Sequence, residues 1–467
     1  MKVALVKPPP TYVDWYRRPI LGISYISAFL KSQGIDCQIF DAQFNLWTQE
    51  ELIHRIVKYR PTLVGFTAMT HEIIPCSQIA VQLKKRLDIP TVVGGPHFTA
   101  MPERTLNEFA AFDYGVIGEG EKTMLELVQF LQQNGTRELP GNIMGIAFRD
   151  SSGRVCTNKL RELSTSSELD MLPFPDFEDY YREPDALAHK DAEYMMISSR
   201  GCPYHCAFCM QVLGRKVRRR SAQNVIDEIE NAISRWRAHS FKFNDEIFLF
   251  NNRETHELLN LMIDKSLPER IRWGGCVRAN LVSEELIKLA KKAGCYRLEI
   301  GVESGDDEIL KAVDKGITTK QIKNAVRIIK ESGITTNAFY ILGHPNETKE
   351  TIKKTIRLAA ELNTDTLGVG IMVPYPGTRI YDMAVKGEGG YRLLTENWAE
   401  YDLYGGEALE LGQLTAGELA KWQKYCFIYF YLRNFRFLDL IKFVFKYRRG
   451  IIFILKKLLP RSSEKVR

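Results

Sequence analysis

The sequence predicts an α/β protein made of an N-terminal doubly wound parallel sheet, a partial six-stranded (β/α)6 barrel and a C-terminal helical segment. Short β-branched strands alternate with helical patterns in two separate stretches, 1–135 and 191–390, which is typical of parallel βαβ units. Between them, 136–190 is rich in Pro, Gly, Ser and acidic residues and predicts a small hairpin and a linker. The remainder, 391–467, ends in an aromatic and basic stretch that predicts a partly amphipathic helix.

The first stretch contains five apolar runs that predict the strands of an open sheet. These runs are 2–6, 37–42, 62–68, 91–95 and 114–120, with helical patterns near 25–32, 50–58, 73–87, 102–109 and 122–133. Because ligands of such sheets bind beyond the carboxyl ends of the strands, the loops at that edge hold the candidate ligand-binding residues. These candidates are Thr67, Thr70, Gly94, Gly95, His97, Gly118, Glu119 and Gly120.

The second stretch predicts six βα units, which fall short of the eight that close a full barrel. The strands are expected at 194–199, 241–245, 271–280, 296–304, 335–343 and 366–374. Functional residues of such barrels lie at the C-terminal ends of the strands. We therefore expect the site of this unit in the loops that follow these runs.

Three cysteines lie in the loop after the first of these strands, in 198-SSRGCPYHCAFCMQ-211. Cys202, Cys206 and Cys209 form C-x3-C-x2-C, and no fourth Cys or His follows at a spacing that would complete a tetrahedral zinc site. Cysteine thiolates also build iron–sulfur clusters, and three ligands on a four-iron cluster leave one iron open. A zinc knuckle completed by His205 or by a distant residue is the alternative, although we expect the His205 side chain to point away from a shared metal. The other six cysteines are scattered, which favours burial in a reducing compartment.

This loop resembles the hallmark of the radical S-adenosylmethionine (SAM) superfamily, in which an aromatic residue precedes the last cysteine, as Phe208 does here. Further motifs resemble the subgroup with an N-terminal cobalamin-binding domain, exemplified by the anaerobic magnesium-protoporphyrin ester cyclases. They are 94-GGPH-97, 117-IGEGE-121, 242-KFNDEIF-248, 300-IGVESG-305, 341-ILGHPNET-348 and 373-VPYPGTRIY-381. The resemblance implies a [4Fe–4S] cluster on the three cysteines, SAM on its open iron and cobalamin in a Rossmann-like first domain.

Polar residues at the ends of the barrel strands favour contacts with SAM. With the aromatic residue of the loop, the candidates are Phe208, Asp245, Glu246, Arg278, Glu303 and Ser304. We expect Asp245 or Glu246 to accept hydrogen bonds from the SAM ammonium, and Arg278 to pair with its carboxylate. Glu303 and Ser304 are expected to hold the ribose hydroxyls. Capping of helices is the alternative for the acids and Ser304, and a surface salt bridge is the alternative for Arg278.

The candidates in the first stretch favour a bulky ligand such as a corrin ring. Gly94 and Gly95 permit a ligand to approach the backbone closely, and the glycines of the next loop, Gly118 and Gly120, permit the same. A dinucleotide would want G-x-G-x-x-G after the first strand, but 7-KPPPTYVDW-15 has no glycine. The motif D-x-H-x-x-G of many cobalamin proteins is absent, so we expect no histidine ligand below the cobalt. His97 and His71 are the exceptions, with ordinary loop histidines as the alternative, and a domain that binds no cofactor stays open.

These features favour an oxygen-sensitive enzyme that uses a 5′-deoxyadenosyl radical to functionalise an unactivated carbon. C-methylation of a hydrophobic small molecule, lipid or tetrapyrrole-like, is the first hypothesis, because a carbon radical can take a cobalt-bound methyl group directly. Radical oxidative cyclisation is the second, and a non-catalytic iron–sulfur or cobalamin sensor is the alternative of another class. Methylthiolation of RNA is disfavoured because Cys37 and Cys76 do not form the second cysteine set of that family. A flavodoxin or ferredoxin is expected as the electron donor.

The positive charge of the chain is concentrated near its end. From Lys421 onward there are 13 Lys and Arg against 2 Asp and Glu, a charge of +11, so the preceding residues sum to −4. This basic, aromatic stretch suits the surface of an anionic membrane, with packing over the barrel as the alternative. No nucleic-acid partner is expected, because no RNA-binding module is appended. Without a signal-peptide pattern or an apolar run of bilayer length, we expect a cytoplasmic protein that can associate with the inner membrane surface.

Overall fold

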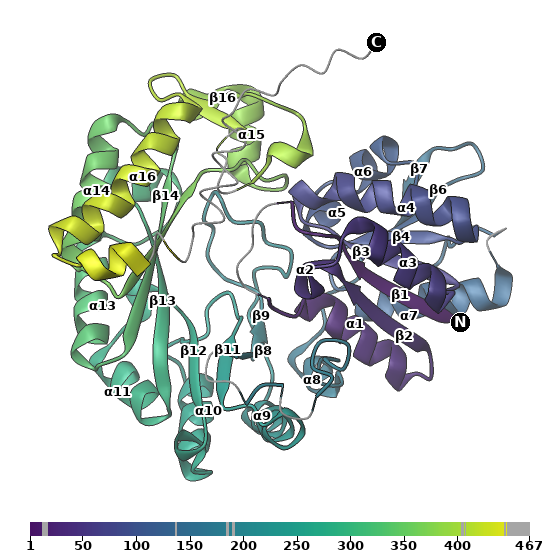
Figure 1. Cartoon of the computed structure of the whole chain (residues 1–467), viewed down its shortest axis with the longest axis horizontal. Helices are drawn as coiled ribbons and strands as arrows, with labels where there is room; N and C mark the ends of the chain where they lie inside the picture. The colour runs from purple at the N-terminus through teal and green to yellow at the C-terminus, as the bar shows by residue number, and fades with distance from the viewer. Residues whose placement is uncertain are drawn as a thin grey trace.

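The computed structural model describes residues 1–11, 17–135, 138–183, 186–188, 192–402, 406, 408–442 and 445. Two α/β units lie side by side, the N-terminal one on the right of Figure 1 and the one with the later strands on the left. The α/β fold class predicted from the sequence is confirmed.

The N-terminal unit is built on a seven-stranded sheet of order β2-β1-β3-β4-β5-β6-β7. Its strands are β1 (Lys2–Lys7), β2 (Asp36–Asp41), β3 (Leu63–Thr67), β4 (Thr91–Gly94), β5 (Tyr114–Val116), β6 (Ile146–Arg149) and β7 (Val155–Thr157). The first five are parallel, whereas β6 pairs antiparallel with β5 and β7 antiparallel with β6. The hairpin expected within 136–190 is therefore part of the N-terminal sheet, and the four domain boundaries given above stay predictions.

Helices cover both faces of this sheet, which is why consecutive residues in the middle of β1 and β3 are buried and apolar instead of alternating. The helices are α1 (Leu21–Ser32), α2 (Ala42–Asn45), α3 (Gln49–Tyr59), α4 (Ile73–Leu87), α5 (Pro96–Ala100), α6 (Pro102–Glu108) and α7 (Glu121–Asn134). Val3 and Leu5 belong to the same core cluster as buried residues of α1 and α7. Ala4 and Val6 belong to a second core cluster with buried residues of α3 and α4.

The second unit is a six-stranded sheet of order β15-β14-β13-β12-β11-β8 in which every neighbouring pair is parallel. The strands are β8 (Tyr194–Met196), β11 (Ser240–Phe243), β12 (Arg272–Val277), β13 (Cys295–Glu303), β14 (Thr335–Leu342) and β15 (Thr366–Ile371). All six coincide with predicted strands, and their sequential order is that of a partial barrel.

The helices between these strands begin at residues whose side chains cap them. The helices are α9 (Ala222–Trp236), α10 (Arg253–Asp264), α11 (Glu284–Lys292), α12 (Asp307–Ala312), α13 (Thr319–Glu331), α14 (Lys349–Leu362) and α15 (Arg379–Lys386). Their capping residues are Ser221, Asn252, Ser283, Asp306, Thr318, Thr348 and Thr378. Each side chain accepts a hydrogen bond from a main-chain N–H of the first turn, which fixes where the strand-end loop stops and the helix starts.

The C-terminal segment contains a short hairpin and one long helix in its described part. The hairpin of β16 (Tyr391–Leu393) and β17 (Leu409–Leu411) was not predicted, and the helix is α16 (Ala416–Arg433). α16 packs on α14 and β15, and the Gln423 side chain donates to the main-chain carbonyl of Val369 at 2.8 Å. No helix among the described residues is long and apolar enough to cross a membrane. Most of the basic tail that was assigned to a membrane surface lies outside the described residues.

Candidate functional site

The cysteine loop runs between β9 (Ser199–Arg200) and β10 (Arg218–Arg219) and is closed by main-chain contacts. Gly201, which opens it, has φ +98°, and a Cβ there would collide with the carbonyl oxygen of Lys216. The N–H of Cys202 donates to Gly214 at 3.1 Å, and that of Cys209 donates to Cys206 at 3.1 Å. The fold therefore presents the three thiols on one short, tied loop.

The three thiols fit an iron–sulfur cluster. Cys209 is exposed, and Cys202 and Cys206 are partly exposed. Although the residue is exposed, the protein atoms around its sulfur desolvate the thiolate and raise the pKa of Cys209 to about 11, and repulsion from the other two thiolates adds to this shift. Such thiols become thiolates when a metal replaces the proton, and three soft donors with an exposed side suit a cluster. Within the part of the chain that the structure describes, no three His, Cys, Asp or Glu side chains converge on one metal ion, and His205 is exposed.

Asp245 holds the chain that leads into this loop. Its carboxylate accepts hydrogen bonds from the N–H of Ser198 at 3.0 Å and from the hydroxyls of Ser198 at 2.7 Å and Ser199 at 2.6 Å. Burial raises the pKa of this carboxyl, and α10 is capped by Asn252, so Asp245 is not the cap of the next helix. The SAM contact of Asp245 stays a prediction.

Glu246 is exposed and lies beside the thiols. Its pKa is raised because the surrounding atoms desolvate the carboxylate, while the N–H of Gly201 opposes this effect. Its charge also raises the pKa values of Cys202 and Cys209. Of the two acids predicted to meet the SAM ammonium, Glu246 is the one whose carboxylate is open to the site.

Arg278 reaches the cysteine loop from the end of β12. The side chain is buried, so the alternative of a surface salt bridge is wrong. Its guanidinium lies 3.8 Å from the ring centroid of Tyr204, and Nη1 lies 3.8 Å from the Sγ of Cys206. The structure thus places Arg278 against a predicted cluster ligand.

Glu303 and Ser304 point in different directions. Glu303 has φ +66° and forms a buried ion pair with Lys315 at 2.6 Å. The Nζ of Lys315 lies 5.7 Å from the ring centroid of Phe208, so this pair faces the cysteine loop. Ser304 is fully buried, and its hydroxyl lies 3.3 Å from that of Thr355 on α14. Ser304 therefore ties its loop to a helix, and Lys315 is a site neighbour that the sequence analysis missed.

Glu119 joins the two units through buried ion pairs. It lies 2.7 Å from Arg218 and 3.2 Å from Arg200, and Arg200 also pairs with Glu121 at 2.6 Å. These arginines stand on β9 and β10, which flank the cysteine loop. Glu119, predicted as a cobalamin contact, is committed to this network instead of facing an open edge.

The glycines mark the carboxyl edge of the N-terminal sheet. Thr67 and Gly94 pair in register at the ends of β3 and β4. Gly95 has φ +93°, and a Cβ there would lie 2.9 Å from the Oγ1 of Thr67. Gly118 has φ +76° and no atom within 4 Å of a Cβ position, whereas one on Gly120 would lie 2.8 Å from a side chain of α1. Gly118 therefore offers free space to a ligand, while Gly95 and Gly120 serve close packing.

His97 and Thr70 are turned into the protein. Both are buried, and the Nδ1 of His97 lies 3.3 Å from the Oγ1 of Thr70. The His97 ring also meets Trp398 edge-on with centroids 5.1 Å apart, and burial lowers its pKa to about 4. His71 is buried beside Glu72. Nothing local in the sequence marks Trp398 as the cover of this edge, since it lies about 300 residues further along.

The two candidate sites meet at Gly377. This residue lies in the loop after β15 and has φ +78°. A Cβ on Gly377 would lie 2.9 Å from the Cβ of Ala100, which ends α5, and 3.9 Å from the Cγ of Met210, which follows Cys209. The carboxyl edge of the first sheet and the cysteine loop are therefore neighbours.

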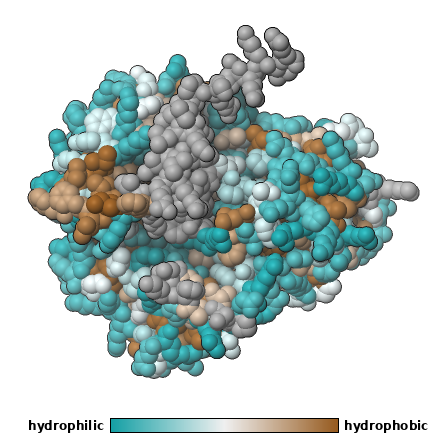
Figure 2. Space-filling model, in the orientation of Figure 1, coloured by the Kyte–Doolittle hydropathy of each residue, from teal (hydrophilic) through white to brown (hydrophobic). Residues whose placement is uncertain are grey.

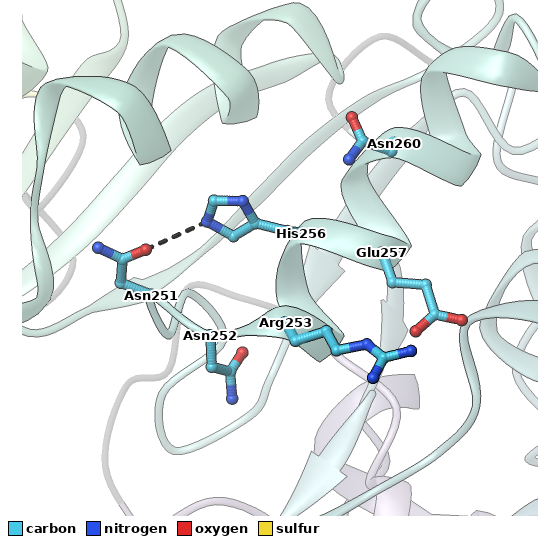
Figure 3. A pocket seen from close by; sticks show the side chains of 6 residues that line it. All are labelled: Asn251, Asn252, Arg253, His256, Glu257 and Asn260. Atoms are coloured by element: carbon cyan, nitrogen blue, oxygen red, sulfur yellow. Dashed lines mark hydrogen bonds between the residues drawn. The ribbon is translucent and has the colours of Figure 1, made fainter.

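A polar depression at the start of α10 lies apart from these residues (Figure 3). It is lined by Asn251, Asn252, Arg253, His256, Glu257 and Asn260. The His256 ring is hydrogen bonded to the amide oxygen of Asn251 at 3.1 Å. None of the predicted site residues belongs to it, so we do not assign it to the site.

Comparisons with known proteins agree with this arrangement. Residues 196–359 match the radical SAM superfamily, and residues 16–128 match the B12 binding domain. An uncharacterized methyltransferase of Pyrococcus horikoshii is 31% identical over 97% of this chain and 96% of its own. The anaerobic magnesium-protoporphyrin IX monomethyl ester cyclase of Cereibacter sphaeroides is 30% identical over 78% of this chain, but only 60% of its own length is covered.

Among solved structures, the radical SAM methyltransferase TsrM of Kitasatospora setae, with cobalamin and a [4Fe–4S] cluster bound, has a similar fold. Its TM-score is 0.72 at 20% identity, covering 93% of this chain and 89% of that one. The resemblance to cobalamin-binding radical SAM enzymes, inferred from the cysteine loop and the strand-end motifs, is confirmed. The chain belongs to the radical SAM superfamily, in the group that joins a B12-binding domain to the radical SAM domain, and it is an enzyme with methyltransferases among its relatives.

Proposed function

We propose that this chain is a cobalamin-dependent methyltransferase that adds a methyl group to an unactivated carbon of a hydrophobic small molecule. When bound, the cluster with SAM supplies a 5′-deoxyadenosyl radical, and cobalamin supplies a methyl group. The position of Gly377 close to both Ala100 and Met210 carries the proposal. Methyl transfer to a substrate radical requires the two cofactors to face one substrate, and this closeness supports neighbouring sites for them.

The residues of the chain divide the work in this proposal. Cys202, Cys206 and Cys209 would hold the cluster, and Glu246 would accept hydrogen bonds from the SAM ammonium. Glu303, oriented by its ion pair with Lys315, would accept hydrogen bonds from the ribose hydroxyls. The free space at Gly118 admits the corrin ring to the edge of the first sheet.

An exposed aromatic ring on the inner side of the barrel sheet supports an apolar substrate. Phe339 on β14 is 42% exposed, whereas its neighbours Ala338 and Tyr340 are buried in the core. It pairs in register with Gly301 on one side and Gly368 on the other. Two glycines beside the ring leave it accessible, and an aromatic surface of this kind favours a flat or apolar molecule.

The first experiment tests which cofactors are present and how SAM is consumed. Full-length protein is purified without oxygen with cobalamin supplied, and iron, sulfide and cobalt are measured. Methyl transfer predicts about four irons and one cobalt per chain, with S-adenosylhomocysteine formed alongside 5′-deoxyadenosine on addition of reductant, SAM and substrate. Absence of cobalt, together with 5′-deoxyadenosine as the SAM product, would contradict methyl transfer.

Oxidative cyclisation is the second candidate, because the cyclase of Cereibacter sphaeroides is 30% identical to this chain. SAM with an isotopically labelled methyl group distinguishes the two reactions. A methyltransferase places the label in the product, whereas a cyclase forms an unlabelled product. In either case the electron is expected from a flavodoxin or ferredoxin in a reducing cytoplasm.

Membrane contact would suit an apolar substrate, and the surface after α16 supports it. Phe435, Leu438 and Ile441 are 78%, 72% and 52% exposed, with Arg433 and Lys442 nearby in sequence. Figure 2 shows hydrophobic residues gathered over this end of the molecule, at its left. Aromatic and aliphatic side chains beside cations are the combination that binds anionic lipid surfaces.

A flotation assay with anionic vesicles tests this contact. Replacing Phe435, Leu438 and Ile441 together with Ser should release the protein from the vesicles. Val385→Ser, at a position 57% exposed on α15, is the matched control and should leave binding unchanged. Equal flotation of all variants would contradict the proposal.

A further inference from the structure

Arg278 differs from the other buried arginines of the described chain in having no carboxylate partner. The fully or nearly buried arginines are Arg200, Arg218, Arg220 and Arg278. The first three pair with Glu119, Glu121 or Glu228. No ion pair of the described residues includes Arg278, which is 5% exposed, and its Nε has no hydrogen-bond acceptor. A buried cation is costly without an anion nearby, so the contacts of this guanidinium indicate its partner.

The contacts of Arg278 indicate where that anion lies. The central carbon of the guanidinium lies over the ring of Tyr204, 3.8 Å from its centroid. Nη1 lies 3.8 Å from the Sγ of Cys206, and Nη2 would lie 3.4 Å from a Cβ at Gly316. Tyr204 is itself part of the cysteine loop, with its carbonyl accepting from Gln211 at 2.5 Å. The ring and the backbone thus hold the guanidinium against a thiol that the family assigns to the cluster.

We propose that Arg278 is a positioning residue whose anionic partner is the Cys206 thiolate, and through it the cluster, and not the SAM carboxylate. Its N–H donates to the sulfur, and its positive charge favours the state of the cluster that has gained one electron. Hydrogen bonds to cluster sulfurs and nearby charge are known determinants of the reduction potential. The electron comes from a low-potential reductant, dithionite in the experiment, and no proton is transferred. The inference rests on the cluster of the proposed function, but it does not rest on methyl transfer.

The test is a redox titration of the full-length protein, reconstituted with iron and sulfide without oxygen and followed by electron paramagnetic resonance. SAM affinity of the oxidised protein is measured in parallel by equilibrium dialysis. Arg278→Gln should make reduction about tenfold less favourable, equivalent to about 59 mV for one electron, with SAM affinity changed by less than about threefold. Tyr204→Leu removes the supporting ring and should shift the potential in the same direction by less.

Arg215→Gln is the matched control. Arg215 belongs to the same loop and donates to the main-chain carbonyl of Tyr204 at 3.1 Å, but it contacts no thiol. Loss of this charge should leave the potential unchanged, which separates the specific contact from the general field of the loop.

Three results would overturn the inference. A loss of SAM affinity of about tenfold or more in Arg278→Gln, with an unchanged potential, would assign Arg278 to the SAM carboxylate. No change in either quantity would leave it a packing residue. If Arg278→Gln holds no iron, the potentials of Arg278→Lys and Tyr204→Leu are measured instead. Unchanged potentials in both variants would contradict an effect of Arg278 on the cluster. Because the titration needs no turnover, a failure to observe methyl transfer would not affect its outcome.

Discussion

The carboxyl edges of the two sheets use their polar residues in opposite ways. At the edge of the N-terminal sheet, Thr70 and His97 are buried beneath Trp398, and Gly118 leaves the free space. At the barrel edge, Arg278 and Glu303 are also buried but face the cysteine loop. The first edge is thus shaped by backbone and the second by charge. The difference indicates that a large ligand is received by the first edge and a charged one by the second.

The largest effect is expected from the cysteines, because they test the charged edge directly. Replacing Cys202, Cys206 and Cys209 together with Ala should abolish iron binding and the visible absorbance of the cluster. Cobalt content should change little if the first edge is independent of the cluster. Cys156→Ala, a partly exposed thiol in the hairpin of β6 and β7, should keep full iron content. Iron retained by the triple variant would contradict the assignment.

A substitution of Glu119 tests whether the cysteine loop depends on its ion pairs with the N-terminal unit. Glu119→Gln removes the carboxylate partner of Arg218, so a buried cation loses its ion pair. The free energy of unfolding should fall by about 3 kcal/mol, measured by denaturant titration, and iron content should fall with it. Glu230→Gln breaks an ion pair of similar length with Arg270, but a half-exposed one, and should cost less than about 1 kcal/mol. Equal losses of stability in the two variants would show that the buried ion pairs between the two units stabilise the protein no more than a surface ion pair does.

Glu347 is a buried carboxyl at the barrel edge that belongs to no cofactor candidate. Burial and the charge of Asp306 raise its pKa from 4.5 to about 8, although the N–H groups of Gly343 and His344 oppose the shift. The folded protein therefore keeps a proton that the unfolded chain releases above its ordinary pKa. The contribution of this carboxyl to the free energy of unfolding should be fully present below about pH 4.5 and should be lost as the pH rises to about 8.

The expected slope in that window is at most about 1.4 kcal/mol per pH unit for this one group. Denaturant titrations of the wild type and Glu347→Gln at several pH values measure it as a difference. The variant should lack this component, because an amide keeps the acceptor oxygen but does not titrate. Parallel pH profiles of the two proteins would exclude the raised pKa.

The smallest change in stability, and a specific one in binding, is expected at Gly118. Gly118→Ala and Gly34→Ala place a Cβ at the same φ of +76° in equally open surroundings. Both should lose about 1 kcal/mol of stability from backbone strain. Only Gly118→Ala should also weaken cobalamin binding, measured by the visible spectrum during titration. A similar loss of affinity in Gly34→Ala would contradict a role for Gly118 at the corrin.

The fold class was predicted correctly from the sequence because it depends on local patterns, and the cysteine spacing that predicts the cluster ligands is equally local. Apolar runs of strand length predict the six barrel strands. The spacing within one loop makes Cys202, Cys206 and Cys209 the predicted cluster ligands. The functions of Asp245 and Glu119 could not be predicted in this way. Their partners Ser198 and Arg200 lie far along the chain, and only the folded sheet brings them together. A charged residue at a strand end thus locates an edge, but not the direction of its side chain.

The packing of α16 has a consequence for how copies of this protein behave in a crowded cell. β15 ends the barrel sheet, so one side of this strand has no neighbouring strand. The Gln423 side chain donates a hydrogen bond to the carbonyl of Val369 on this strand. Arg436, just after the helix, donates to the carbonyls of Thr364 at 2.8 Å and Asp365 at 2.7 Å. An uncovered strand edge is a template for pairing with another chain. The helix thereby protects this strand edge from pairing with another chain. A chain that ended before α16 would expose the edge and would be prone to fibril-like association.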